Sequence, residues 1–174
     1  MSLRPADLKR IDDLHPDVRF LCLEHHRQCE VNGVDFWVPQ GYRTKAQHTS
    51  IWQQGRNDDG QIVRPDLVVT HSPPGWSFHE YGLAYDVVVV LKDGRHVTWD
   101  MATDSDHDQI SDYLEIARIG RMLGMEAGFF WRHPDPPHFE YHPNLNIRET
   151  IEKFGMTRRV PDDYFWKMKA ESPA

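Results

Sequence analysis

The sequence SFHEYGLAYDVVVVL, from Ser77 to Leu91, joins ionisable side chains directly to the most apolar run of the chain. Residues 85–91 are rich in valine, which is typical of a buried strand. Lys92-Asp93-Gly94 has turn chemistry, so residues 95–99 are predicted to return as the hairpin partner. Asp86 lies immediately before four valines. Because desolvating an uncompensated charge costs several kcal/mol, this carboxylate must have a partner or bind a cation.

The flanking sequence predicts helices and further strands around this hairpin. Apolar spacing, capping residues and terminal glycines indicate helices over residues 16–32, 45–54, 110–123 and 147–154. Short strands are predicted over residues 34–38, 129–131 and 138–141. Residues 57–76 have no sustained period and predict a long surface loop. The mixture predicts an α+β domain, with a small antiparallel β-sheet flanked by helices.

The composition allows one domain of ordinary size. The chain has 174 residues and a formal net charge of −7, and no repeat or linker divides it. We expect a single domain over residues 1–174, with a core over about residues 15–155 and a helical extension over about residues 156–174. No apolar run approaches the roughly 20 residues of a membrane helix. The excess of acidic over basic residues also gives no basic surface of the kind that binds nucleic acid. Membrane insertion and nucleic-acid binding are therefore not expected.

Histidine is abundant and cysteine is scarce, with 11 and 2 residues respectively. Cys22 and Cys29 lie seven residues apart on a predicted helix, so their Cα atoms should be about 10.5 Å apart, beyond disulfide reach. Their spacing also differs from the Cys-x-x-Cys pairs of structural zinc sites. Any metal must therefore be held by histidines and carboxylates.

A second group of ionisable residues, HPDPPHFEY, occupies residues 133–141. Like the group in residues 77–86, it adjoins a predicted strand. Two imidazoles and one carboxylate make a three-ligand zinc site that leaves a fourth position for water, which is the pattern of catalytic zinc. We therefore predict that His79, Asp86 and His138 are metal ligands.

Asp135 precedes His138 by three residues. Residues before proline favour extended or polyproline geometry, which repeats every three residues, so the two side chains are predicted to project to the same side. A carboxylate beside a metal-activated water can take its proton and pass it to a leaving amine. The pair therefore indicates a hydrolase.

The other ionisable residues near these segments are expected to be ordinary. His79-Glu80 begins like the zincin motif His-Glu-x-x-His, but the fifth residue is Leu83, so Glu80 is expected to be an exposed neighbour. The remaining histidines are expected to be solvated or hydrogen-bonded rather than metal-bound, and most of them to lie on the surface. This group comprises His15, His25, His26, His48, His71, His96, His107, His133 and His142.

The pattern Ser77-x-His79-x-x-Gly82-x-Ala84-x-Asp86, followed by Asp135-x-x-His138, resembles the peptidoglycan-cleaving zinc peptidases. The group is that of the D-Ala-D-Ala carboxypeptidases and L-alanyl-D-glutamate peptidases, which are VanY-like and have the hedgehog/DD-peptidase fold. Gly41-Tyr42-Arg43-Thr44 with Gln47 is similar to its upstream motif. The match spans about residues 15–142. One departure is the segment GFFWR at residues 128–132, where many members have a Trp-Gly-Gly-like sequence.

The resemblance implies a zinc site in a groove over the sheet, ligated by His79, Asp86 and His138, with Asp135 as general base. It also implies that Arg43 contacts the substrate or stabilises the developing oxyanion. Three further residues are predicted to contact the substrate: Ser77, Gln47 and Trp131. For Ser77, an ordering role in its own loop is an equal alternative.

The predicted function is zinc-dependent hydrolysis of a peptide bond in the peptidoglycan stem peptide, with L-alanyl-D-glutamate endopeptidase as the first choice. D-Ala-D-Ala carboxypeptidase or dipeptidase is the alternative within the class. A non-catalytic wall-binding module that keeps zinc for stability is disfavoured by Asp135, and a metal nuclease by the acidic charge.

The N-terminus has no apolar signal segment. This fits an endolysin-like protein that stays in the cytoplasm until it is released to the wall, while export after removal of a signal is the alternative. We expect a monomer.

Overall fold

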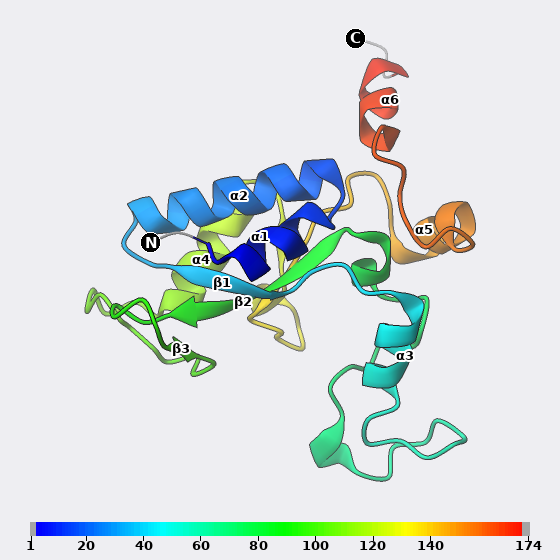
Figure 1. Cartoon of the computed structure of the whole chain (residues 1–174), viewed down its shortest axis with the longest axis horizontal. Coiled ribbons are helices and arrows are strands. Elements are labelled where there is room, and N and C mark those ends of the chain that lie inside the picture. Colours follow the sequence, from blue (N-terminus) through cyan, green and yellow to red (C-terminus); the bar gives the residue numbers. More distant parts are fainter. Residues whose placement is uncertain (1–2, 172–174) are drawn as a thin grey trace.

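The computed structural model describes residues 3–171 and is built around an antiparallel sheet with strand order β1-β2-β5-β4 (Figure 1). The strands are β1 Phe36–Gln40, β2 Ala84–Val90, β3 Val97–Thr98, β4 Glu126–Ala127 and β5 His138–Glu140. Strand β2 is central, because it pairs with β1 along one edge and with β5 and β3 along the other. The predicted fold class and the β2–β3 hairpin are confirmed.

Six α-helices and three short 3₁₀ turns are seen in the described residues. The α-helices are α1 Pro5–Asp12, α2 Pro16–Val31, α3 Lys45–Trp52, α4 Asp112–Met122, α5 Ile147–Phe154 and α6 Tyr164–Glu171. The 3₁₀ turns are η1 Pro65–Leu67, η2 Phe78–Tyr81 and η3 Gly128–Phe130. The predicted helices correspond to α2, α3, α4 and α5, and capping boxes at Thr44 and Asn146 begin α3 and α5. Helix α1 was not predicted.

The two faces of β2 differ because successive side chains of a strand point to opposite sides. Tyr85, Val87 and Val89 are fully buried in the hydrophobic core. Asp86 therefore points to the other face. In strand β5, Phe139 is opposite Tyr85 and His138 is opposite Asp86. The pairing register thus gathers apolar residues on one face and ionisable residues on the other.

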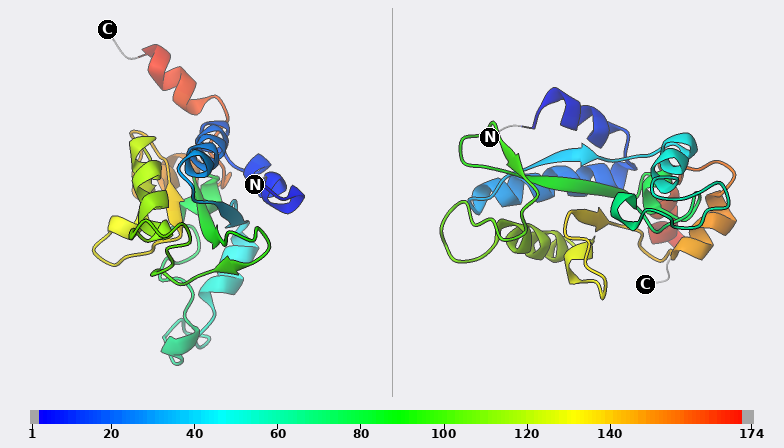
Figure 2. Two further views of the ribbon diagram at one scale, coloured as in Figure 1. Left: turned by 90° about the vertical axis from the view of Figure 1, so that its left-hand side faces the viewer. Right: turned by 90° about the horizontal axis from the view of Figure 1, so that it is seen from below.

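Helices α2 and α4 lie side by side and cover the apolar face (Figure 2). His25 of α2 is fully buried there, with its ring centroid 4.9 Å from that of Phe36 and 4.7 Å from that of Phe139. Its Nε2 donates to the Ile116 carbonyl oxygen at 2.8 Å. In α4, a Cβ atom on Gly120 would lie 2.5 Å from the Phe139 ring, so the helix can pack this closely only with glycine.

One predicted strand was wrong. Residues 129–131 do not form a strand, because the Gly128 carbonyl oxygen accepts the N–H groups of Trp131 and Asp135 and closes a tight turn. Four of the histidines that were expected to be solvated or hydrogen-bonded are buried, and each is held by a hydrogen bond or an ion pair: His15, His25, His26 and His48.

The C-terminal segment adds to the core beyond residue 155. Val160 is fully buried and Phe165 is 2% exposed. The Phe165 ring packs edge-on against His15 at 4.9 Å. Helix α6 therefore docks through its first turn, while its remainder projects away from the sheet (Figure 1). Within the described residues, we find no helix with the length and apolar character needed to cross a membrane.

Candidate active site

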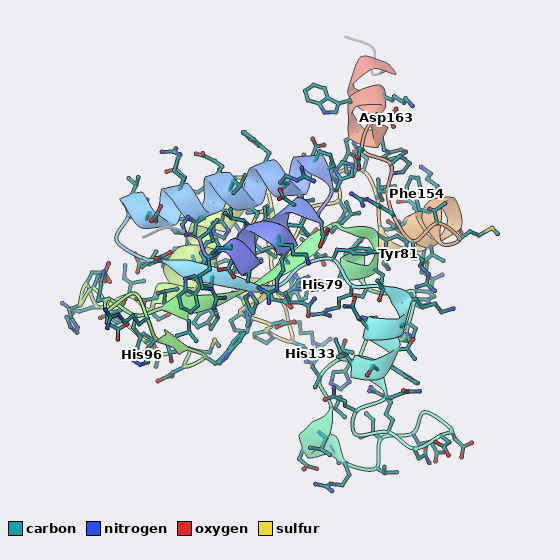
Figure 3. The ribbon with its side chains drawn as sticks, in the orientation of Figure 1. His79, Tyr81, His96, His133, Phe154 and Asp163 are labelled. Carbon is teal, nitrogen blue, oxygen red and sulfur yellow. The ribbon has the colours of Figure 1, made fainter. Side chains whose placement is uncertain are left out.

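The ionisable face of the sheet borders a cavity of about 570 Å³. Its walls come from β1, β2, β5, α3 and the loop that precedes η2. Figure 3 shows His79 where the sheet meets α3, and His96 at the opposite end of the sheet. Three partly exposed tryptophans line the cavity: Trp76, Trp99 and Trp131.

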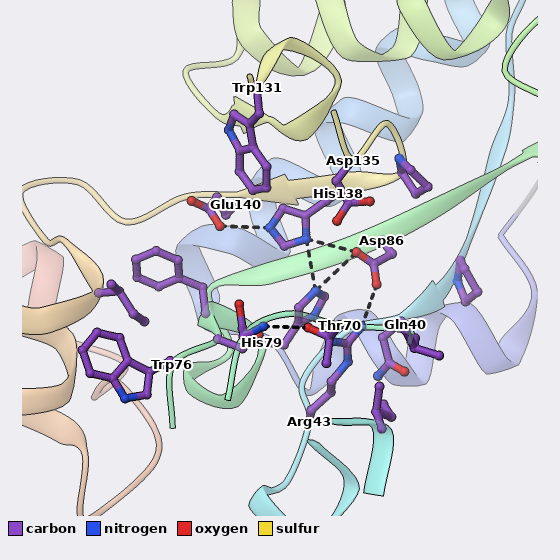
Figure 4. Close-up of a pocket in the computed structure, with 18 of the residues that line it drawn as sticks. Gln40, Arg43, Thr70, Trp76, His79, Asp86, Trp131, Asp135, His138 and Glu140 are labelled. Carbon is purple, nitrogen blue, oxygen red and sulfur yellow. Dashed lines mark hydrogen bonds and ion pairs between the residues drawn. The ribbon is translucent and has the colours of Figure 1, made fainter. Parts of the chain in front are cut away.

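Three of the predicted residues converge in this cavity (Figure 4). His79 Nε2 is 3.2 Å from His138 Nδ1 and 3.3 Å from Asp86 Oδ1. His138 Nδ1 is 3.1 Å from the same Asp86 oxygen. His79 and His138 are buried, and Asp86 is half-buried. The structure thus brings together one potential ligand atom from each of the three residues.

Each of the three side chains is oriented by an outer partner. His79 Nδ1 donates to the Gly41 carbonyl oxygen at 2.8 Å, which leaves a lone pair on Nε2. His138 Nε2 donates to Glu140 Oε2 at 2.9 Å. Asp86 Oδ2 accepts from Arg43 Nη2 at 2.8 Å. Outer partners of this kind fix ring orientation and tautomer in metal sites.

The electrostatics of the cluster favour a positive charge at its centre. Burial lowers the pKa of His79. Burial alone would raise the pKa of Asp86, but the neighbouring imidazoles bring it well below the usual range. Burial opposes protonation of His138, yet hydrogen bonds to Asp86 and Glu140 raise its pKa to about 10. A proton or a metal ion can supply this positive charge.

The three ligand atoms fit zinc. Tetrahedral zinc with bonds of about 2.0–2.1 Å to nitrogen and oxygen has ligand atoms about 3.3–3.4 Å apart. The separations here are 3.1, 3.2 and 3.3 Å. Two imidazoles and one carboxylate are also a donor set that zinc takes in catalytic sites. The cluster therefore has suitable spacing and chemistry for zinc, with one position left open.

Asp135 lines the same cavity. The predicted polyproline geometry was wrong, because the His138 N–H donates to the Asp135 carbonyl oxygen at 3.0 Å and residues 135–138 form a turn. A Cβ atom on Gly128 would lie 2.4 Å from that same oxygen, so the absence of a side chain at Gly128 lets the turn approach. Burial raises the pKa of Asp135 above its usual range, which suits a group that must accept a proton.

Arg43 lies in the wall of the cavity with its side chain 12% exposed. Its Nη2 binds Asp86, and its backbone N–H donates to the His79 carbonyl oxygen at 3.0 Å. Its Nε atom is buried and has no hydrogen-bond partner. Arg43 thus orients a predicted metal ligand and keeps one donor unused beside the cavity.

The predicted substrate contacts lie in different places. Ser77 and Trp131 line the cavity, with the Trp131 ring centroid 5.1 Å from that of His138. Gln47 is not among the lining residues, because its Oε1 accepts from the Thr44 backbone and hydroxyl in the capping box of α3. We therefore assign no substrate contact to Gln47.

Sequence reasoning missed Glu140 and His142. Glu140 Oε2 accepts from His138, and its Oε1 lies 3.0 Å from His142 Nε2. The His142 ring stacks on Phe78 with centroids 4.1 Å apart. Because these residues follow His138 at intervals of two, strand alternation placed them on one face and could have identified them.

The expectation for Glu80 was wrong. It is fully buried, its Oε2 accepts from the Gly75 N–H at 2.5 Å, and its Oε1 pairs with Arg158. Arg158 comes from the segment between α5 and α6, so its charge was not apparent from the residues around Glu80. The pair links the cavity loop to the C-terminal segment.

A histidine–aspartate cluster with the Asp135 carboxylate in the same cavity, on the face of an antiparallel sheet, is the arrangement of a metal-dependent hydrolase. A family model described as D-alanyl-D-alanine carboxypeptidase matches residues 70–141. The peptidoglycan L-alanyl-D-glutamate endopeptidase CwlK of Bacillus subtilis (strain 168) is 35% identical over 139 residues, which are 79% of this chain and 79% of that protein. The chain belongs to this family of peptidoglycan peptidases, which are generally zinc-dependent.

The fold is also that of a solved relative. The crystal structure of the Serratia marcescens L-Ala D-Glu endopeptidase ChiX matches with a TM-score of 0.54 and 23% sequence identity. The match covers 82% of this chain and 88% of that chain.

Proposed function

We propose that this protein is a zinc-dependent endopeptidase that cuts the L-alanyl-D-glutamate bond of the peptidoglycan stem peptide. The observation that carries the proposal is the convergence of His79 Nε2, Asp86 Oδ1 and His138 Nδ1 within 3.3 Å of one another in a cavity that also contains Asp135. The choice of the L-alanyl-D-glutamate bond is supported by the 35% identity to CwlK, which is named an L-alanyl-D-glutamate endopeptidase.

In this proposal, His79, Asp86 and His138 hold the zinc ion. When bound, zinc acts as a Lewis acid that makes water a stronger nucleophile near neutral pH and polarises the scissile carbonyl. Asp135 takes a proton from the attacking water and gives it to the leaving amine. Its raised pKa lets the carboxyl group both accept and return that proton.

Arg43 and the outer partners support this chemistry. Arg43 lines the cavity and keeps a buried Nε–H group without a partner, so its guanidinium can donate to the oxygen that becomes negative during the attack. The Gly41 carbonyl and the Glu140 carboxylate hold the two imidazoles in fixed orientations. Trp76, Trp99 and Trp131 offer flat apolar surface to the substrate.

Digestion of purified muropeptides tests the proposal. We expect new N-terminal D-glutamate and new C-terminal L-alanine, identified by mass spectrometry and end-group analysis. A chelator should abolish the cleavage and added zinc should restore it. Release of terminal D-alanine alone would instead establish a D-Ala-D-Ala carboxypeptidase, and zinc binding without any cleavage would indicate a wall-binding module.

A further inference from the structure

Residues 104–115, DSDHDQISDYLE, connect β3 to α4 and carry an unusual density of carboxylates. Counted from Asp104 as position 1, the acidic side chains stand at positions 1, 3, 5, 9 and 12: Asp104, Asp106, Asp108, Asp112 and Glu115. The twelve-residue calcium loop of EF-hands places its ligands at these positions and at the backbone carbonyl of position 7. The spacing departs from that pattern only at position 6, where Gln109 replaces glycine.

The fold brings these carboxylates together. Asp104, Asp106 and Asp108 each offer a ligand atom within 4.8 Å of the other two. Asp106, Asp112 and Glu115 do the same. Because Asp106 belongs to both groups, the two groups adjoin each other where the loop meets the first turn of α4.

Two oxygens in this group are buried without a partner. Asp112 is 0% exposed, and its Oδ1 accepts from the Ser105 N–H at 2.9 Å. Its Oδ2 is buried and accepts no hydrogen bond, and the same holds for Glu115 Oε2. A buried carboxylate oxygen with no donor is costly unless a cation binds it.

The charges that act most strongly on Glu115 are negative. Burial raises the pKa of Glu115 to about 7, and the aspartates at positions 3, 5, 9 and 1 add to the rise. The group therefore repels itself at neutral pH. A divalent cation would remove both the repulsion and the unpaired oxygens.

The backbone has the turn that the calcium loop requires. In EF-hands, position 6 is glycine because the chain turns sharply there. Here Gln109 occupies that position with φ +74°, in the left-handed region. The chain thus keeps the turn without the usual residue.

We infer that residues 104–115 form a calcium site, separate from the cluster of His79, Asp86 and His138. The ligands are the five carboxylates and the backbone carbonyl oxygen of Ile110. Calcium takes 6–8 oxygen ligands in flexible geometry, whereas zinc takes four ligands and includes nitrogen or sulfur among them. A ligand set that offers only oxygen therefore favours calcium over zinc, and the one imidazole of the loop, that of His107, belongs to a residue that is exposed and is not in the proposed set.

Calcium titration of the zinc-loaded full-length chain tests the inference. We expect saturable binding of about one Ca²⁺ per chain by calorimetry, with a rise in Tm as CaCl₂ is added. Glu115→Gln should lose both responses, because position 12 supplies the bidentate ligand. Glu152→Gln, which changes an exposed carboxylate on α5, should respond as the wild type does.

Measuring the variants in the absence of calcium distinguishes the loss of a ligand from misfolding. Glu115→Gln removes a like charge, so its Tm without calcium should equal or exceed that of the wild type. If that variant fails to fold, Asp104→Asn serves as the second test and should weaken calcium binding at least tenfold. The inference is overturned if the wild type shows no response up to about 10 mM CaCl₂, well above the weakest class of such sites. It is also overturned if Glu115→Gln responds like the wild type while His79→Ala does not, since calcium would then occupy the catalytic cluster.

Discussion

The cluster around His79 and the acidic loop of residues 104–115 both gather ligand atoms, but they differ in donors and in support. In the cluster, two imidazole nitrogens and one carboxylate oxygen lie within 3.3 Å of one another, and each side chain has an outer partner. In the loop, carboxylate oxygens gather in two groups of three that share Asp106, and Asp112 and Glu115 each keep a buried oxygen without a partner.

This difference indicates what each region can do. Chemistry at a metal requires ligands that hold their geometry while one position stays open, and outer hydrogen bonds provide that rigidity. A site that only binds a cation can use flexible oxygen ligands, which the cation itself draws together. Breaking the cluster should therefore remove activity, whereas breaking the loop should change stability and leave the chemistry in place.

The largest expected effect is on the chemical step. Asp135→Asn keeps the shape of the side chain but removes its ability to accept a proton. We expect kcat to fall by about 10²–10⁴-fold, because general-base catalysis contributes about that much. Zinc content should stay at about one ion per chain, since Asp135 is not among the proposed ligands. Measuring muropeptide cleavage and bound metal on the same preparation checks both. Full activity in this variant would remove Asp135 from the mechanism.

The next largest expected effect is on the pH dependence of stability. It comes from His25, a buried imidazole that lies outside both regions and, unlike His79, is not a predicted metal ligand. Burial lowers the pKa of His25 to about 4. Below pH ~6.5 the unfolded chain binds a proton at this residue that the folded chain does not bind, so stability falls as the pH drops from about 6.5 to about 4. The contribution reaches about 3 kcal/mol at the lower end.

Chemical denaturation in chelator across this pH range measures the effect. His25→Phe should flatten the loss of unfolding free energy, even though it lowers stability at neutral pH. His96→Gln is the matched control, because His96 is exposed and Asp93 raises its pKa rather than lowering it. Equal slopes for His25→Phe and the wild type would contradict the assignment.

Glu140→Gln tests how much the outer hydrogen bond to His138 supports metal binding by the cluster. The substitution keeps a hydrogen-bond acceptor for His138 Nε2 but removes the negative charge that favours a cation at the centre. Loss of such a partner typically weakens metal binding 10–100-fold, and we expect that reduction in zinc affinity. Competition with a chromogenic chelator measures it. Glu126→Gln is the control, since Glu126 is exposed and pairs with His142 rather than with His138. An unchanged affinity in Glu140→Gln would show that its charge is not needed.

The two regions also show what a sequence can reveal. His79 and His138 lie 59 residues apart, and their motifs were enough to predict that they meet at one site. The outer partners were harder, because Gly41 contributes only a carbonyl oxygen and Arg158 reaches Glu80 from a segment whose path depends on the whole fold. The acidic loop is contiguous, and its spacing was readable from residues 104–115 alone. The sheet hairpin followed from its valines, whereas the turn at Gly128 did not, because it depends on contact with Asp135.

The smallest expected effect concerns the turn of the acidic loop. Gln109 has φ +74°, which costs an L-residue roughly 1–2 kcal/mol, and glycine carries no such cost. Because glycine also gives the unfolded chain more freedom, Gln109→Gly should stabilise the protein by no more than about 1 kcal/mol. Gln28→Gly, three residues before the end of α2, should instead destabilise it by about 1 kcal/mol. Denaturation of both variants without calcium measures the difference. If both substitutions destabilise equally, Gln109 does not adopt the left-handed turn, and the resemblance of the loop to a calcium site then rests on its carboxylates alone.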